Sequence, residues 1–141
     1  MNMAAKMTRR EAREYIMGLI YETEFHENGD KEAIFESATE EREIPKDSFI
    51  KDAYFAICEK LSEIDALIAK HSVGWKTERM SRVSRAVLRL AVYELAFCDD
   101  IPSRVSINEA IELTKKYDDD KAKAFVNGIL NAVKNDVGEK E

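Results

Sequence analysis

The amino-acid sequence predicts a single all-α domain on the basis of three observations. Only 5 glycines and 2 prolines, the residues that interrupt helices, occur among 141 residues. Every apolar pattern longer than about eight residues recurs with the helical period of about 3.6. A chain of this length also suits one domain, since most domains have roughly 100–150 residues. We therefore expect one domain over residues 1–141, with frayed ends at about 1–7 and 136–141.

The helices in the first half of the chain follow from their apolar faces and end signals. The first begins at 8–11 (Thr-Arg-Arg-Glu), a pattern typical of a capping box, and ends near Phe25. A weaker, peripheral helix ends before Pro45, because the residue before a proline avoids the helical conformation. One long amphipathic helix is then expected from about Asp47 to Lys70, with an apolar face that must pack on other helices.

The second half of the chain contains the expected centre of the bundle. Residues 81–97 carry apolar side chains around most of the helix circumference, which is typical of a helix buried on several sides. Residues 106–109 (Ser-Ile-Asn-Glu) match a second capping box that would open the next helix. A last helix should begin in 118–120 (Asp-Asp-Asp), since carboxylates favour a helix N-terminus.

The charge of the chain is distributed unevenly. The formal net charge of −6 argues against a general nucleic-acid binder, yet residues 1–13 have a net charge of +3, with cations at Lys6, Arg9, Arg10 and Arg13. At about 100° per residue, the three arginines share one arc away from the apolar face. We expect this arc to be exposed and to contact RNA phosphates. The alternative is a solvated helix face in which the arginines pair with neighbouring glutamates.

A second basic row lies on one face of the expected central helix. Its members, at intervals of three, three and four residues, are Arg79, Arg82, Arg85 and Arg89. Because that helix is largely buried, we expect Arg89 to pair with a carboxylate such as Glu94 or Glu109 inside the bundle. Arg79 and Arg82, near the start of the helix, are the better candidates for an interface.

Motifs for catalysis, metal binding and nucleotide binding are missing. The sequence has no GxGxxG, GxxxxGK[ST], HExxH or GxSxG pattern. Cys58 and Cys98 are far apart, and His26 and His71 stand alone, so neither zinc nor a disulfide framework is indicated. No apolar run approaches the roughly 20 residues that cross a bilayer, and the N-terminal residues lack the apolar stretch of a signal peptide. We expect a cytoplasmic protein without catalytic activity, metal or cofactor.

Three parts of the sequence resemble the NusB family. They are 9–14 (RREARE), 82–95 (RVSRAVLRLAVYEL), and 107–113 (INEAIEL) with 125–130 (FVNGIL), and the similarity covers about residues 8–133. The resemblance implies an all-helical fold of about six to seven helices in two packed subdomains. It also implies a transcription antitermination factor that binds boxA RNA with NusE, a small-subunit ribosomal protein, in an antitermination complex on RNA polymerase. A homodimer that hides the RNA surface is a further state known in the family.

The resemblance implies two groups of RNA-binding residues. One is the N-terminal arginine cluster, to which the charge pattern adds Lys6. The other is the opening of the last helix, here Lys121, Lys123 and Phe125. Guanidinium groups suit this role because they match phosphate geometry and stack on unpaired bases.

The resemblance also implies where NusE would bind. The expected contacts are Tyr21 on the first helix, with Met17 on the same flank, and the region of Arg82 and Ser84 on the central helix. Some family members have an acid where this chain has Ser84. A charge pair with a basic NusE residue is therefore open at that position.

Two alternatives to an antitermination factor follow from the same residues. One is a non-catalytic helical adaptor whose arginines are only solvated surface. The other is a NusB-like domain related to those that precede the catalytic part of certain ribosomal-RNA cytosine methyltransferases, since a fold alone does not fix a function. The 141 residues leave no room for a cofactor-binding α/β domain, which disfavours the enzyme.

Overall fold

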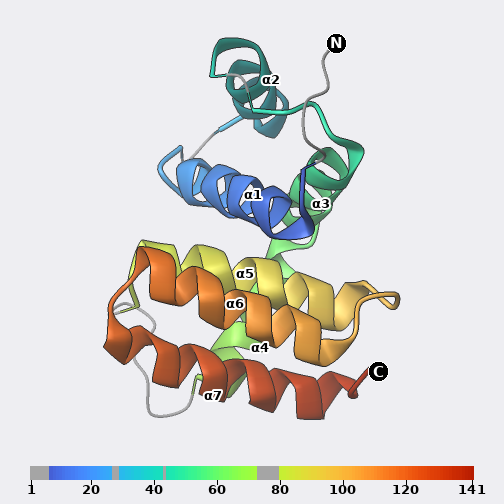
Figure 1. The fold of residues 1–141 in the computed structure, drawn as a ribbon, viewed down its shortest axis with the longest axis vertical. Helices are drawn as coiled ribbons and strands as arrows, with labels where there is room; N and C mark the ends of the chain where they lie inside the picture. The colour runs from blue at the N-terminus through green and yellow to red at the C-terminus, as the bar shows by residue number, and fades with distance from the viewer. Residues whose placement is uncertain (1–6, 27–28, 43, 73–79) are drawn as a thin grey trace.

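The computed structural model describes residues 7–26, 29–42, 44–72 and 80–141. Over these ranges the chain forms seven α-helices and no strand (Figure 1). The helices are α1 Arg9–Glu24, α2 Lys31–Glu41, α3 Ser48–Glu59, α4 Leu61–His71, α5 Arg82–Phe97, α6 Ser103–Tyr117 and α7 Asp120–Val137. Among these helices, none combines the length and the apolar character that a membrane span needs. The predicted all-α fold is confirmed.

The helices form two packed groups, joined where α1 lies on α5. In Figure 1, α1, α2 and α3 make the upper group, and α4, α5, α6 and α7 make the lower one. α5 packs against α1, α3, α4, α6 and α7, and its side chains Val87, Leu88 and Val92 are completely buried. Both the central position of this helix and the two subdomains agree with the prediction.

Three helix starts agree with the sequence signals. The Thr8 hydroxyl accepts a hydrogen bond from the Glu11 amide at 3.1 Å, and the Glu11 carboxylate accepts one from the Thr8 amide at 2.8 Å. This capping box opens α1. The side chains of Ser81 and Asp119 cap α5 and α7 in the same way, by accepting from amides of the first turn.

The single helix predicted from Asp47 to Lys70 is wrong, because the chain changes direction at Lys60. Lys60, with φ −102° and ψ 15°, ends α3 and directly precedes α4. No glycine or proline causes this break. α3 packs on α1, whereas α4 packs on α5 and α7, so the change of direction lets each half bury its apolar face on a different partner. The Lys60 ammonium lies 4.8 Å from the centroid of the Phe97 ring, a cation–π contact that stabilises the joint.

The capping box predicted at 106–109 is also wrong. α6 begins three residues earlier, at Ser103. The Ser106 hydroxyl donates to the Glu94 carboxylate at 2.7 Å, and Glu109 accepts from Arg10 on α1. Both side chains of the expected box therefore face other helices, and these tertiary contacts replace the local cap.

The C-terminal residues, expected to fray from Asp136, are held against the bundle. Asp136 contacts two basic side chains at the end of α4. The Lys140 amide donates to the Ser103 hydroxyl at 2.8 Å, and the Lys140 carbonyl accepts from the Ser103 amide at 2.8 Å. The Lys140 ammonium donates to the main-chain carbonyls of Glu94 and Cys98. The last residues thus close the corner between α5 and α6.

Deletion of residues 138–141 should lower the free energy of unfolding by about 2–6 kcal/mol, because it removes the hydrogen bonds of Lys140 to Ser103, Glu94 and Cys98, and each intramolecular hydrogen bond contributes about 0.5–1.5 kcal/mol. Urea unfolding measures this change. Deletion of Glu141 alone is the control, since no hydrogen bond of Lys140 is lost. Equal unfolding midpoints for both deletions would show that the contacts of Lys140 add no stability.

Candidate nucleic-acid and protein interfaces

Arg13, expected on the exposed arc of α1, is buried. Its side chain, with the residue 5% exposed, donates from Nε to Glu94 Oε2 at 2.8 Å and from Nη2 to Glu94 Oε1 at 3.3 Å. Glu94 also accepts from the Ser106 hydroxyl. One buried ion pair thus joins α1 to α5 and, through Ser106, to α6. The prediction that Arg13 points outward is wrong, because the side of α1 on which Arg13 lies packs on α5, next to residues of α6.

Arg10 remains exposed although it also pairs with a carboxylate. Its Nε and Nη2 donate to the two oxygens of Glu109 at 3.0 and 2.9 Å, and 56% of its side chain is exposed. This bidentate contact holds the pKa of the Glu109 carboxyl below its usual value and raises the pKa of Arg10. Since a guanidinium has five N–H donors, Arg10 keeps unused donors for a ligand.

Arg9 is exposed and stacks on α3. Its guanidinium carbon lies 3.9 Å from the centroid of the Phe49 ring, which is cation–π distance. Arg9 and Arg10 therefore form the exposed part of the predicted arginine cluster. Lys6, like Arg79 of the second basic row, lies outside the described residues.

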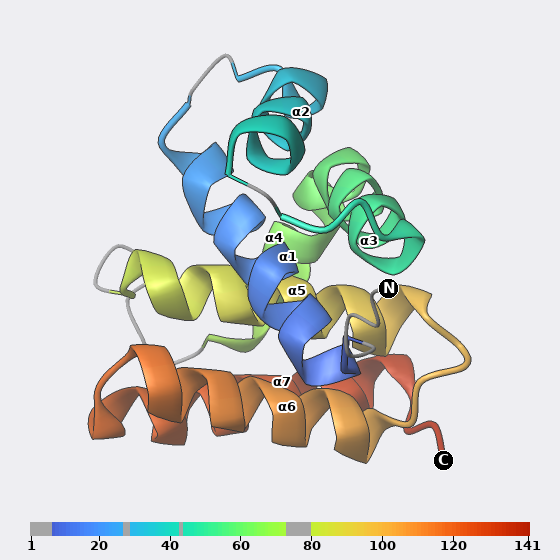
Figure 2. The same cartoon turned by 45° about the horizontal axis from the view of Figure 1, so that its top comes forward.

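The second group of predicted RNA-binding residues lies at the start of α7. Lys121 is exposed, the Lys123 ammonium is 3.8 Å from a carboxylate of the preceding turn, and Phe125 is half-buried against the core. Figure 2 shows the start of α1 over α6. Arg10 contacts α6 near its middle, at Glu109, whereas α7 begins just after α6 ends. The structure therefore does not bring the two groups into direct contact.

An aromatic patch lies where the end of α1 meets the start of α5. Tyr21 contacts Phe25 edge to face, with 5.1 Å between ring centroids, and the Arg82 guanidinium carbon lies 4.3 Å from the Phe25 centroid. We call Tyr21, Phe25 and Arg82 the aromatic patch. Phe25 was missed from the sequence, although its position four residues after Tyr21 is a signal for contact on a helix. Met17, predicted on this surface, is buried in the core instead.

Ser84 is also buried, so the structure does not place its side chain on the surface predicted to bind NusE. Its hydroxyl donates to Asp118 Oδ2 at 2.6 Å, and the Ser81 hydroxyl donates to the same oxygen at 2.5 Å. Burial opposes ionisation of Asp118, but the two hydroxyls and the Asp119 amide, which also donates to this carboxylate, together lower its pKa. The negative charge beside the start of α5 therefore belongs to Asp118.

The remaining arginines of α5 gather around Glu24 at the end of α1. Arg82, Arg85 and Arg89 approach its carboxylate at 3.3, 2.5 and 3.1 Å. Arg89 also makes a bidentate contact with Asp65 on α4, at 2.9 Å for both bonds. The predicted pairing of Arg89 with a carboxylate is confirmed, but its partners differ from the two glutamates that were expected.

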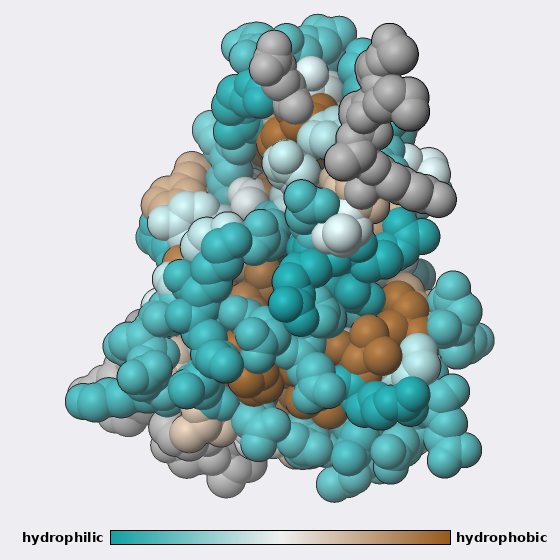
Figure 3. Space-filling model, viewed as in Figure 1, coloured by the Kyte–Doolittle hydropathy of each residue, from teal (hydrophilic) through white to brown (hydrophobic). Residues whose placement is uncertain are grey.

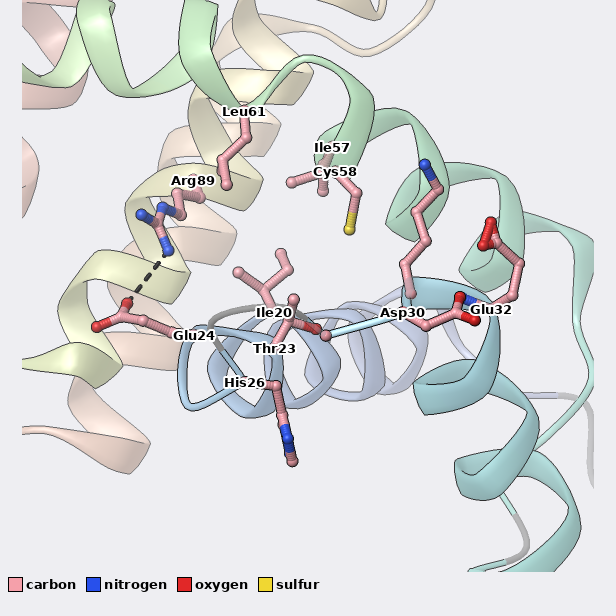
Figure 4. A pocket seen from close by; sticks show the side chains of 12 residues that line it. Ile20, Thr23, Glu24, His26, Asp30, Glu32, Ile57, Cys58, Leu61 and Arg89 are labelled. Atoms are coloured by element: carbon pink, nitrogen blue, oxygen red, sulfur yellow. Dashed lines mark hydrogen bonds and ion pairs between the residues drawn. The ribbon is translucent and has the colours of Figure 1, made fainter.

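A hollow of about 520 Å³ lies beside this cluster, between α1, α2 and α3 (Figure 4). Ile20, Ile57, Leu61 and the Cys58 thiol line its apolar part, and His26 is directed away from it. Burial raises the pKa of the Cys58 thiol, so this sulfur is a poor nucleophile. Within the described ranges, no three His, Cys, Asp or Glu side chains come together as a metal site would require.

Comparison with known sequences gives a consistent result. The sequence model of the NusB family matches residues 10–135. The transcription antitermination protein NusB of Agathobacter rectalis is 46% identical over 127 residues, which cover 88% of this chain and 97% of that protein. The protein of the same name from Bacillus subtilis is 42% identical over 131 residues, which cover 93% of this chain and 98% of that protein.

Solved structures share the fold. NusB of T. maritima superimposes with a TM-score of 0.82 at 38% identity, covering 93% of each chain. A crystal structure of the antitermination factors NusB and NusE in complex with double-stranded RNA gives a TM-score of 0.79 at 29% identity. That match covers 91% of this chain and 96% of the other.

Replacement of Arg13 by alanine should lower the free energy of unfolding by about 3–5 kcal/mol, because it leaves the Glu94 carboxylate buried without its partner. The matched control is Arg9→Ala on the same helix, which should cost less than about 1 kcal/mol. Urea unfolding compares the two. The double variant Arg13→Met, Glu94→Met should recover most of the loss, since it removes both charges. Equal stability of the two single variants would contradict this role of the ion pair.

Proposed function

The chain belongs to the NusB family, and from this premise we propose that it is a transcription antitermination protein that binds boxA RNA together with NusE, a small-subunit ribosomal protein. The complex acts with RNA polymerase in the cytoplasm. The chain contributes binding and positioning, without catalysis, metal or cofactor. A homodimer that hides the RNA surface stays a prediction.

The RNA surface comprises Arg9 and Arg10 at the start of α1 and Lys121 and Lys123 at the start of α7. The support is that Arg9, Arg10 and Lys121 are exposed and Lys123 partly exposed, and that all four are positively charged on a chain whose formal net charge is −6. Arg9 also presents a stacked guanidinium plane, which suits an unpaired base as well as a phosphate. Phe125, half-buried beside Lys123 along α7, is the aromatic side chain of this surface.

NusE binds the aromatic patch. Phe25 is 50% exposed at the end of α1, although a phenylalanine is usually buried. Tyrosine and arginine are the residue types that contribute most often to protein interfaces, and the patch contains one of each. The acidic balance of the chain suits a basic ribosomal protein, since opposite charges speed association.

The observation that carries the proposal is that α1 contributes to both surfaces, one at each of its ends. The helix has 16 residues and therefore spans about 24 Å. Arg9 and Arg10 lie in its first turn, and Tyr21 lies in its last turn just before Phe25. RNA and NusE can occupy the two ends together without competing for the same side chains. Contacts between the two ligands would then raise the affinity for each of them.

The double variant Arg9→Ala, Arg10→Ala should bind boxA RNA more weakly than the parent, both alone and with NusE. Each lost phosphate contact should reduce the slope of log affinity against log salt by roughly 0.7 for single-stranded RNA. Fluorescence anisotropy at several salt concentrations gives both quantities. Arg42→Ala, which removes an equally charged and half-exposed arginine from α2, is the control. Parental affinity and slope in the double variant would exclude an RNA contact at the start of α1.

Phe25→Ala should weaken the affinity for NusE about ten-fold, because truncation of a central interface aromatic usually costs more than about 1 kcal/mol. Its RNA affinity in the absence of NusE should stay unchanged. Isothermal titration calorimetry provides the first value. Tyr15→Ala is the control, since Tyr15 is another exposed aromatic residue, 37% exposed on α1, that lies outside the aromatic patch. If both variants bind NusE equally, the protein partner docks on another surface.

A further inference from the structure

The groove between α1 and α6 holds three cations, each paired with a carboxylate. Arg10 pairs with Glu109 at 2.9 Å, Lys116 with Glu14 at 2.7 Å, and Lys115 with Glu112 at 3.3 Å. A hollow of about 310 Å³ lies among them. Its lining residues are Arg10, Glu14, Glu112, Leu113, Lys115 and Lys116. The groove is therefore rich in charge and close to neutral.

The two pairs that cross from α1 to α6 are arranged with their cations outward. The side chains of Arg10 and Lys116 are 56% and 59% exposed, against 17% for Glu109 and 23% for Glu14. Each cation also keeps N–H donors that its carboxylate does not use, since a guanidinium has five and an ammonium three. Each cation is therefore accessible to a ligand phosphate, although the carboxylate beneath it already neutralises part of its charge.

The groove also lies between the two groups of proposed RNA-binding residues, which are at the start of α1 and at the start of α7. Arg10 contacts α6 near its middle, and Lys121 follows its end. Lys115 and Lys116 lie on α6 between these two points, and no sequence pattern had marked them as ligand-binding residues. Figure 3, viewed as Figure 1, shows the face of the molecule on which α1 and α6 lie. Hydrophilic side chains cover much of this face.

We infer that this groove is a phosphate-binding subsite for the RNA backbone, in which Arg10 and Lys116 bind the phosphate and Glu109 and Glu14 compete with it. The inference rests on the proposed function and adds residues that limit the affinity. A carboxylate beside each cation repels an incoming phosphate and weakens its attraction. Because every RNA has phosphates, the carboxylates weaken indiscriminate backbone binding. Selectivity then depends on base contacts and on NusE.

The test is to remove one carboxylate charge at a time. Glu109→Gln and Glu14→Gln should each bind RNA about two- to five-fold more tightly than the parent, the range that corresponds to an exposed ion pair. The gain should appear with boxA RNA and with an unrelated RNA of equal length. Lys116→Gln should bind both RNAs more weakly. Fluorescence anisotropy in the absence of NusE gives the affinity of the parent and of each variant for both RNAs.

A matched control separates the groove from the net charge of the protein. Glu22→Gln raises the net charge by the same single unit. Glu22 also pairs with an exposed arginine, Arg42, at 2.7 Å, but this pair lies at the end of α2. Its RNA affinity should stay within error of the parent. The gain in RNA affinity from Glu109→Gln should also be smaller in the Arg10→Gln variant, because Glu109 acts through that arginine.

Three outcomes would overturn the inference. If Glu109→Gln gains no more than Glu22→Gln, the effect is only that of net charge. If Glu109→Gln binds more weakly than the parent, Glu109 orients Arg10 for RNA and does not compete. If Lys116→Gln binds as the parent does, RNA does not follow the groove. If the parent with NusE binds boxA RNA no more tightly than the unrelated RNA, while the groove variants behave as expected, the proposed function is refuted and the phosphate-binding subsite still stands.

Discussion

The buried ion pair between Arg13 and Glu94 is the interaction on which the arrangement of this protein depends. It joins the helix that begins the upper group to the central helix of the lower group, and Ser106 brings α6 into the same contact. At the other end of α1 the signs are reversed, because Glu24 accepts from the arginines of α5. Opposite polarity at the two ends fixes both the direction and the rotation of α1 on α5, since any other orientation would leave charges buried without partners.

That fixed rotation decides which side chains are available for ligands. With Arg13 directed inward, Arg9 and Arg10 occupy the surface at the first turn, and Tyr21 is exposed at the last turn. The surfaces proposed for RNA and NusE are therefore consequences of a structural contact in the interior. They would shift together if α1 turned about its axis.

The sequence predicted the fold well because period, composition and caps are local properties. The capping box at Thr8 and Glu11 and the buried character of α5 follow from neighbouring residues alone. The fate of Arg13 could not be predicted in this way, because its partner Glu94 is 81 positions away and an angular calculation describes only one helix. The same reason explains the start of α6: Ser106 faces Glu94 across the bundle rather than its own helix end. The break at Lys60 likewise depends on what each half packs against, and no residue there is a helix breaker.

The opposed polarity of the α1 contacts also governs how sequences with this fold can diverge. An exchange at Arg13 is tolerated only with a matching exchange at Glu94, and Glu24 is tied to three arginines at once. Phe25 and Arg9 can be exchanged without a compensating substitution, because one side of each faces solvent. Evolutionary drift in ligand preference can therefore proceed by single substitutions at the two ends of α1. The orientation of the helix that presents those ends changes only through coupled substitutions, which arise far more rarely.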